Sequence, residues 1–347
     1  MAHTLPGITS NFIDAGIQQH YLEAGPSDAP WVVLVHGNVS SSTFWLPLMA
    51  ALATDYHVVA PDLRGYGETQ ASGVDATRGV RDWSDDLHAF TKALGIRSAH
   101  FVGWSMGGGV VMQYLLDHPE VVASLSLQAP VSPYGFGGTS ADGNLLNPDA
   151  SGTGGGGANP EFVSNLRGGM REDAGPTSPR GVMRQFYVAD ASCLGALEDA
   201  FVDSMLTTVV GDANYPGTMS ASDFWPNFGP GDTGVLNTMS PKYFNTSGIV
   251  DLAVKPRVLW IHGEADQIVG DASFFDLNTL GKFGVIPGWP GEDVASPQPM
   301  VSQTRAVLST YAERGGSFTE LALPGCGHAP HLERPAEVES ALRAHFG

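Results

Sequence analysis

Residues 99–117 read AHFVGWSMGGGVVMQYLLD, an apolar run followed by a helical pattern, with the pentapeptide GWSMG at 103–107 between them. A serine on a sharp strand-to-helix turn needs small residues two positions before and two positions after it, because side chains there would clash with the neighbouring backbone. Glycine occupies both positions. The stretch therefore predicts a buried strand, an exposed Ser105 hydroxyl, and a helix whose first N–H groups face a developing negative charge.

Around this stretch, short apolar runs alternate with helical patterns, which is typical of a mostly parallel sheet flanked by helices. A helix is predicted at 80–94, with apolar residues on one face and Asp82, Asp85 and Asp86 on the solvent side. The predicted strands are 11–15 and 18–23, which form an opening hairpin, and 31–35, 57–60, 99–102 and 122–128.

The pattern changes from about 133 to 248, where glycine, proline, asparagine and aspartate recur without a strong period. After residue 248 the alternation of apolar runs and helical patterns resumes. It predicts strands at 258–262 and 317–323 and helices at 299–314 and 335–346. We therefore expect a discontinuous α/β core, 1–133 and 250–347, that is interrupted by an inserted cap (lid) region at 134–249.

The composition is that of an acidic globular protein. Of 347 residues 42% are hydrophobic, and 36 acidic residues against 17 basic ones give a formal net charge of −19. Such a field repels phosphate backbones and anionic lipid headgroups, so we expect no nucleic-acid or membrane partner. No apolar stretch approaches the 18 or so residues of a membrane-spanning helix.

The first 25 residues lack the basic and apolar regions of a secretory signal, so the sequence predicts a cytoplasmic protein. Cys193 and Cys326 are too few for a disulfide framework and do not have metal-type spacing. We expect two reduced thiols and no bound metal.

A second informative strand, VVLV at 32–35, ends in His36-Gly37-Asn38 and leads into a loop. Together with the serine pentapeptide, this pattern resembles the α/β-hydrolase superfamily. The resemblance implies that His36 holds the loop and that the backbone N–H groups of Asn38 and Met106 form an oxyanion hole. The alternative for Asn38 is a simple turn residue.

A third segment, PDLRGYGET at 61–69, resembles the family's DxRGxGxS segment, with Thr69 where serine is usual. This segment is informative about the fold and says little about the catalytic residues. We expect Asp62 and Arg64 to have structural roles, in a turn and in an ion pair.

A serine hydroxyl is a weak nucleophile until a base takes its proton, and that base needs a third group to hold its tautomer. A late histidine is therefore expected. The segment GCGHAPHLERP at 325–335 resembles the family's GxGHxPxxExP segment, which places His328 as the base. Its rival is His331, which either reaches the same cleft or packs under the closing helix.

The acid is expected after a late strand, and WIHGEADQIV at 260–269 resembles the family's GxxDxxV segment. Asp266 takes the position of the acid, with Glu264 as the nearest alternative. Asp266 and His328 are 62 residues apart, a longer interval than is usual in the family. The excess lies in 271–299, which we interpret as an added loop near the cleft, either a surface loop or a substrate contact.

An acyl-transfer site benefits from a cover that excludes water and from an apolar pocket. Trp104, beside the nucleophile, and Val39 are the predicted substrate contacts. Some apolar cap residues are also candidates for the pocket, although most of them should form the cap's own core: Met183, Phe186, Tyr187, Met205, Met219, Phe224, Trp225 and Phe228.

The resemblance implies a serine hydrolase that cleaves a small carboxylic ester or lactone through an acyl-enzyme on Ser105, without a cofactor. Ser105 argues against dehalogenase and epoxide chemistry, which use aspartate at this position. The enzymatic alternatives are hydrolysis of carbon–carbon bonds in ring-opened aromatic products and cofactor-free perhydrolase (haloperoxidase-like) activity. A ligand receptor on the same fold is the non-enzymatic alternative. A monomer or small homo-oligomer is expected.

Overall fold

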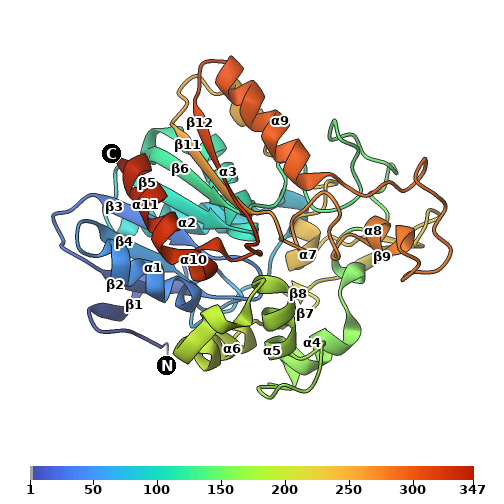
Figure 1. Ribbon diagram of the computed structural model, residues 1–347, viewed down its shortest axis with the longest axis horizontal. Helices are drawn as coiled ribbons and strands as arrows, with labels where there is room; N and C mark the ends of the chain where they lie inside the picture. Colours follow the sequence, from blue (N-terminus) through green and yellow to red (C-terminus); the bar gives the residue numbers. More distant parts are fainter. Residues whose placement is uncertain (1–2) are drawn as a thin grey trace.

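The computed structural model describes residues 3–347. An eight-stranded sheet runs through it in the order β1-β2-β4-β3-β5-β6-β11-β12 (Figure 1). β1 and β2 form the predicted antiparallel hairpin, β2 pairs antiparallel with β4, and all other neighbours are parallel. The strands are β1 (Ile8–Asp14), β2 (Gln18–Ala24), β3 (Trp31–Val35), β4 (His57–Pro61), β5 (Ala99–Trp104), β6 (Val122–Gln128), β11 (Val258–Gly263) and β12 (Phe318–Leu323).

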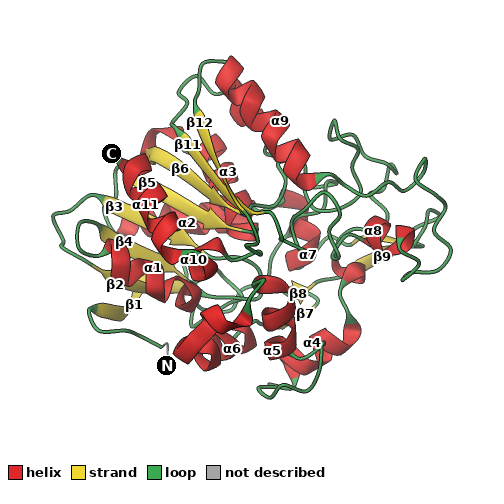
Figure 2. Ribbon diagram, viewed as in Figure 1, coloured by secondary structure: helices red, strands yellow, loops and turns green. Residues whose placement is uncertain are grey.

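Helices cover both faces of this sheet (Figure 2). α1 packs against α11 on one face, and α2 packs against α3 on the other. Central parallel strands are covered on both sides, which explains why they are nearly continuous apolar runs. These core helices are α1 (Leu46–Leu52), α2 (Arg81–Ala93), α3 (Met106–Asp117), α9 (Met300–Glu313), α10 (Pro330–Glu333) and α11 (Pro335–Phe346). The mostly parallel sheet flanked by helices is therefore confirmed.

The solvent side predicted for helix 80–94 is wrong in part. Asp82 and Asp86 are buried, and only Asp85 is exposed. Arg64 Nη2 lies 2.5 Å from Asp86 Oδ1, and Arg78 pairs with Asp82. Buried carboxylates are tolerated when cations pair with them, and helical periodicity does not show that other segments supply those cations. The ion pair expected of Arg64 is confirmed.

Between β6 and β11 the chain forms short elements beside the sheet, which Figure 1 draws in green and yellow. The boundaries of a cap at 134–249 stay a prediction. The helices of this segment are α4 (Pro160–Arg167), α5 (Pro179–Val182), α6 (Glu198–Leu206) and α7 (Val235–Thr238). Its strands pair as β7 (Val210–Gly211) with β8 (Tyr215–Pro216) and β9 (Met219–Ala221) with β10 (Phe228–Pro230).

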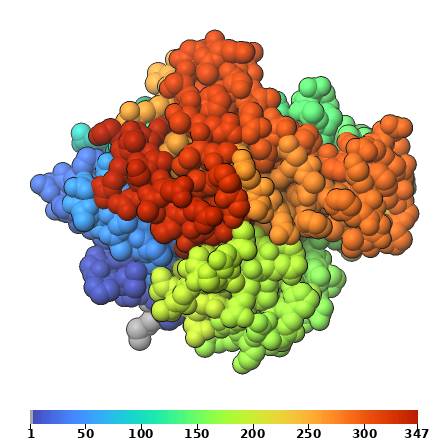
Figure 3. Space-filling view, in the orientation of Figure 1, coloured from blue at the N-terminus to red at the C-terminus, as the bar shows by residue number. Residues whose placement is uncertain are grey.

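The 271–299 segment contains α8 (Leu277–Lys282) and forms a lobe beside that insertion, orange in Figure 3. The remaining helical turns are a π-helix at Met183–Tyr187 and 3-10 helices at Ser42–Trp45, Ala76–Arg78, Pro119–Val121, Gly155–Gly157, Ala191–Leu197 and Ser247–Asp251. Within residues 3–347, no helix has both the length and the apolar character that crossing a membrane requires. The cytoplasmic location stays a prediction.

Candidate active site

Ser105 lies at the sharp turn between β5 and α3. Its φ of 56° and ψ of −121° are unusual for a residue with a side chain, and such strain is common at functional sites. A Cβ on Gly103 would lie 2.4 Å from the carbonyl oxygen of Gly107, and one on Gly107 would lie 2.3 Å from that of Val35. The two glycines are thus required by sterics, as the pentapeptide predicts.

His328 and Asp266 form a buried pair. The His328 Nδ1 and Asp266 Oδ2 atoms are 2.8 Å apart, and the two side chains are 3% and 1% exposed. Asp266 Oδ1 also accepts from the N–H groups of Ile268, at 2.8 Å, and Val269, at 3.0 Å, which fixes the carboxyl group. An ionised carboxylate only accepts, so Nδ1 carries the hydrogen and Nε2 is left as an acceptor.

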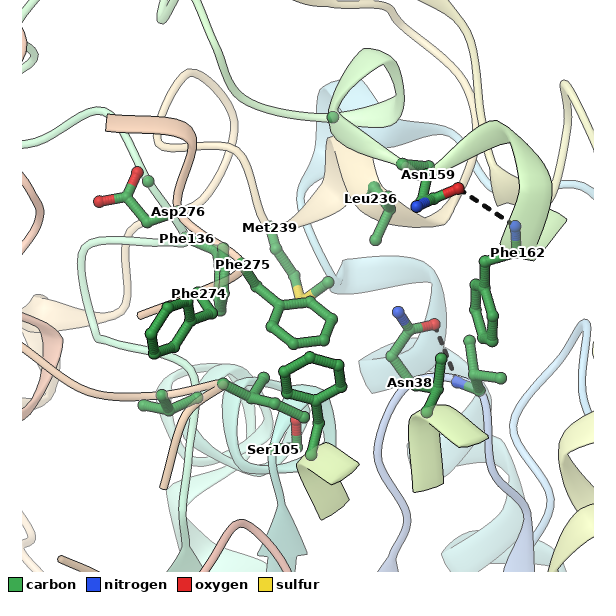
Figure 4. Close-up of a pocket in the computed structure, with 18 of the residues that line it drawn as sticks. Asn38, Ser105, Phe136, Asn159, Phe162, Leu236, Met239, Phe274, Phe275 and Asp276 are labelled. Atoms are coloured by element: carbon green, nitrogen blue, oxygen red, sulfur yellow. Dashed lines mark hydrogen bonds between the residues drawn. The ribbon is translucent and has the colours of Figure 1, made fainter. Parts of the chain in front are cut away.

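Ser105 and His328 line one cavity, and Ser105 lies at its floor in Figure 4. Among residues 3–347, no hydrogen bond joins the Ser105 hydroxyl to the His328 ring. Such bonds are often long in unliganded enzymes and tighten when substrate binds. The arrangement therefore brings together a serine on an elbow, a histidine with a free Nε2 and a fixed carboxylate.

Two backbone N–H groups beside Ser105 are available. A Cβ on Gly37 would lie 3.0 Å from the Ser105 Cβ, so the loop that begins at Gly37 runs against the nucleophile. Within residues 3–347, the N–H groups of Asn38 and Met106 have no acceptor, and Met106 is the first residue of α3. Free donors at a helix N-terminus suit a developing oxyanion.

The loop after β3 is held by side chains. His36 Nε2 accepts from the N–H of Leu63 at 3.0 Å, while its Nδ1 donates to the Gly37 carbonyl at 2.8 Å. The Tyr187 hydroxyl lies 3.1 Å from the carbonyl oxygens of both Asn38 and Val39. His36 therefore has the structural role that the resemblance implies, and Tyr187 ties the insertion to the same loop.

The two rivals for the triad positions lie elsewhere. His331 is fully buried beneath the site, where its Nδ1 lies 3.2 Å from Gln128 Oε1 and its ring packs on Trp45. Burial lowers the pKa of His331 to about 3, so its ring is neutral at physiological pH. Glu264 is exposed to solvent.

The cavity has a volume of about 320 Å³, and its lining is largely apolar, with several aromatic side chains. Trp104 and Val39, the two predicted substrate contacts, both line it. Of the cap candidates, Phe186 and Tyr187 line it, whereas Met183 and Met205 are buried elsewhere and Met219 is exposed. Phe224, Trp225 and Phe228 are likewise outside the lining.

Several aromatic residues of the lining are not among the predicted contacts. Phe136 and Phe162 come from the aperiodic insertion, and Phe274 and Phe275 come from the 271–299 segment. That segment is thus part of the cavity wall. The adjacent pair of phenylalanines, a few residues after the candidate acid, is the signal that could have indicated this.

The family profile described as alpha/beta hydrolase fold matches residues 30–151. The chain has the α/β-hydrolase fold. The matched segment contains Asn38 and Ser105, while Asp266 and His328 lie beyond it. The hydrogen bond between Asp266 and His328 is thus an observation independent of the profile match.

Part of the chain is similar in sequence to carboxylesterases. It is 36% identical over 118 residues to the uncharacterized carboxylesterase nap of Bacillus subtilis, a match that covers 34% of this chain and 39% of that relative. The match thus spans about two fifths of the relative's length.

Two solved esterase structures from Bacillus subtilis share the fold over 98% of this chain. The carboxylesterase CesB (YbfK) has a TM-score of 0.60 at 16% identity, with 91% of its own chain covered. The naproxen esterase (carboxylesterase NP) has a TM-score of 0.59 at 20% identity, with 92% of its chain covered.

Proposed function

We propose that this α/β-hydrolase is a serine esterase that hydrolyses a carboxylic ester or lactone. The observation that carries the proposal is the buried His328–Asp266 pair, whose histidine lines the same cavity as the strained Ser105. A base held by a fixed carboxylate, in the cavity that also holds the candidate nucleophile, is the arrangement that acyl transfer through a serine requires.

In the proposed mechanism, the Ser105 oxygen attacks the substrate carbonyl carbon while its proton moves to His328 Nε2. The negative charge that develops on the carbonyl oxygen is held by the N–H groups of Asn38 and Met106. When the tetrahedral intermediate collapses, His328 returns the proton to the departing alcohol oxygen. Water then repeats the attack on the acyl-enzyme, which releases the acid and restores Ser105.

The largely apolar lining supports esters with apolar acyl or aryl groups, because burying such groups in the cavity is favourable. None of the described residues that line the cavity is lysine or arginine. Ring-opened aromatic products carry carboxylates, and a buried carboxylate needs a cation. We therefore favour ester hydrolysis over cleavage of a carbon–carbon bond.

The test is hydrolysis of a chromogenic ester series, from acetyl to dodecanoyl, by the wild type and by Ser105→Ala. We expect the wild type to prefer one acyl length and the variant to lose at least about a thousandfold in kcat/KM, with the same melting temperature. A folded wild type that hydrolyses neither an ester of this series nor a lactone assayed beside it would contradict the proposal. That result would favour one of the alternatives: hydrolysis of a carbon–carbon bond, perhydrolase activity, or a ligand receptor on the same fold.

A further inference from the structure

The cavity differs on the two sides of Ser105 (Figure 4). Phe136, Phe274 and Phe275 lie on one side, where the only labelled polar residue is Asp276. The other side carries Asn38 and Asn159, two amides that line the same space. A largely apolar pocket with a few convergent polar groups is the usual form of a small-molecule site, and the polar groups set specificity.

The orientation of the Asn159 amide is fixed by its role at the start of α4. Its Oδ1 accepts from the N–H groups of Glu161, at 2.9 Å, and Phe162, at 3.3 Å. Only an oxygen can accept these bonds, so the nitrogen is the atom left over. In the described chain, that Nδ2 group has no acceptor.

The same reasoning orients Asn38. Its Oδ1 accepts from the N–H of Val39 at 2.9 Å and from the hydroxyl of Tyr66 at 2.7 Å, which leaves Nδ2 without an acceptor within residues 3–347. The hydroxyl of Tyr215, which is 5% exposed and also lines the cavity, has no hydrogen-bond partner among those residues either. Three uncharged donors thus have no partner among the described residues, on a buried Tyr215, a half-buried Asn38 and an exposed Asn159.

The charges of the cavity wall limit what these donors can bind. The lining residues that the structure describes include no cation, and one of them is the buried carboxyl of Asp276, which accepts from the N–H groups of Asn278 and Gln298. A substrate carboxylate beside the donors would lose its hydration without gaining a cation. An uncharged oxygen atom can accept from the donors without that cost.

We propose that Asn38 Nδ2, Asn159 Nδ2 and the Tyr215 hydroxyl form a subsite for an uncharged oxygen of the substrate, such as a ketone or ether oxygen. The subsite selects neutral esters that carry a second acceptor and rejects those that carry a carboxylate there. This inference rests on the proposed esterase function. Sites built to pair with a polar group discriminate strongly against analogues that lack it, because donors that solvent does not reach then stay unpaired; this applies most to the buried Tyr215 and the half-buried Asn38.

Three 4-nitrophenyl esters of nearly equal size test the subsite: the hexanoate, the 5-oxohexanoate and the hydrogen glutarate. Their acyl chains end in a methyl group, a methyl ketone and a carboxylate. The same three groups are also placed on the alcohol side of an acetate ester, so that either binding direction is sampled. In one of the two series we expect kcat/KM for the ketone to exceed that for the hydrocarbon about tenfold, with the carboxylate lowest.

Variants then assign the effect to the donors. Asn159→Ser and Asn159→Asp both keep an oxygen that caps α4, but neither keeps the amide nitrogen. Each should lower the ketone-to-hydrocarbon ratio of kcat/KM about threefold to tenfold, and so should Tyr215→Phe. Asn245→Asp is the matched control, because Asn245 Oδ1 also accepts from a backbone N–H, that of Ser247, but lies outside the cavity lining.

Equal rates for the ketone and the hydrocarbon in both series would overturn the subsite, and so would ratios that the Asn159 and Tyr215 variants leave unchanged. Efficient hydrolysis of the carboxylate ester would also overturn it. In all these cases the proposed esterase function stands. Absence of Ser105-dependent hydrolysis of every ester would instead contradict the proposed function.

Discussion

The indole N–H of Trp104 donates a 2.7 Å hydrogen bond to the backbone carbonyl of His328. The two residues are 224 positions apart in the chain, and the Trp104 side chain is almost fully buried. The residue directly before the candidate nucleophile therefore holds the loop that carries the candidate base. We infer that Trp104 is a positioning residue as well as part of the cavity floor.

Trp104→Phe keeps an aromatic ring but removes this bond. We expect the free energy of unfolding to fall by about 1–3 kcal/mol, because the buried carbonyl loses its donor. We expect kcat to fall about tenfold with a smaller change in KM, since a displaced His328 affects proton transfer more than binding. Urea unfolding and steady-state ester kinetics measure the two effects, and an unchanged kcat would rule out the positioning role.

Asp266→Asn tests the proposed acid. The amide cannot hold His328 in the tautomer that leaves Nε2 as an acceptor, so kcat should fall by about 10⁴ while the fold is retained. The melting temperature and the near-UV circular dichroism report on the fold. Glu264→Gln is the control and should stay within about twofold of the wild type, because Glu264 is exposed. Comparable losses of kcat in both variants would contradict the assignment of Asp266 as the acid.

Gly107→Ala tests the steric argument for the elbow. The new Cβ would lie 2.3 Å and 2.4 Å from the backbone oxygens of Val35 and His36, so the backbone has to shift. We expect a loss of about 1–3 kcal/mol in the free energy of unfolding, together with lower activity. Gly211 has nothing within 4 Å of its Cβ position, so Gly211→Ala should change stability by less than about 1 kcal/mol. Equal effects at both glycines would contradict the argument.

The stability of the protein should fall as the pH drops below about 6.5. Burial, assisted by the nearby Arg257, lowers the pKa of both His100 and His345 to about 4. Between about pH 4 and 6.5 the unfolded chain binds protons that these native side chains do not, so the free energy of unfolding rises with pH there. Each group contributes a slope approaching about 1.4 kcal/mol per pH unit.

His345→Gln should therefore flatten the dependence of stability on pH by about that slope between pH 4.5 and 6, as should His100→Gln. Urea unfolding at half-unit intervals of pH measures the slope for each variant and for the wild type. Slopes identical to that of the wild type in both variants would show that the two histidines are not buried in the neutral form.

Much of the core followed from local patterns. The predicted strands 31–35, 57–60 and 122–128 agree with β3, β4 and β6 to within one residue. Helix 80–94 is α2 with slightly shorter ends. Local rules suffice here, because a parallel strand covered on both faces is an apolar run and an amphipathic helix repeats every 3.6 residues.

The structure of the insertion and the lining of the cavity could not be predicted from local patterns. Eight cap residues were candidates for the pocket, and only Phe186 and Tyr187 line it. Phe274 and Phe275 reach it from a segment that the sequence left open between surface loop and substrate contact. Without a repeating pattern, aromatic residues buried in their own core cannot be told from those that face a cavity.

The nucleophile elbow can be predicted from the local sequence. The glycines at 103 and 107 are required by atoms of the same turn and of an adjacent strand. The His328–Asp266 pair, the Trp104–His328 bond and the unused amide of Asn159 depend on segments that are far apart in the chain. Steric constraints and hydrophobic periodicity involve residues close together in the chain, so their structural consequences can be predicted from the sequence. Hydrogen-bond partners and cavity walls are set by long-range packing, which only the folded chain brings about.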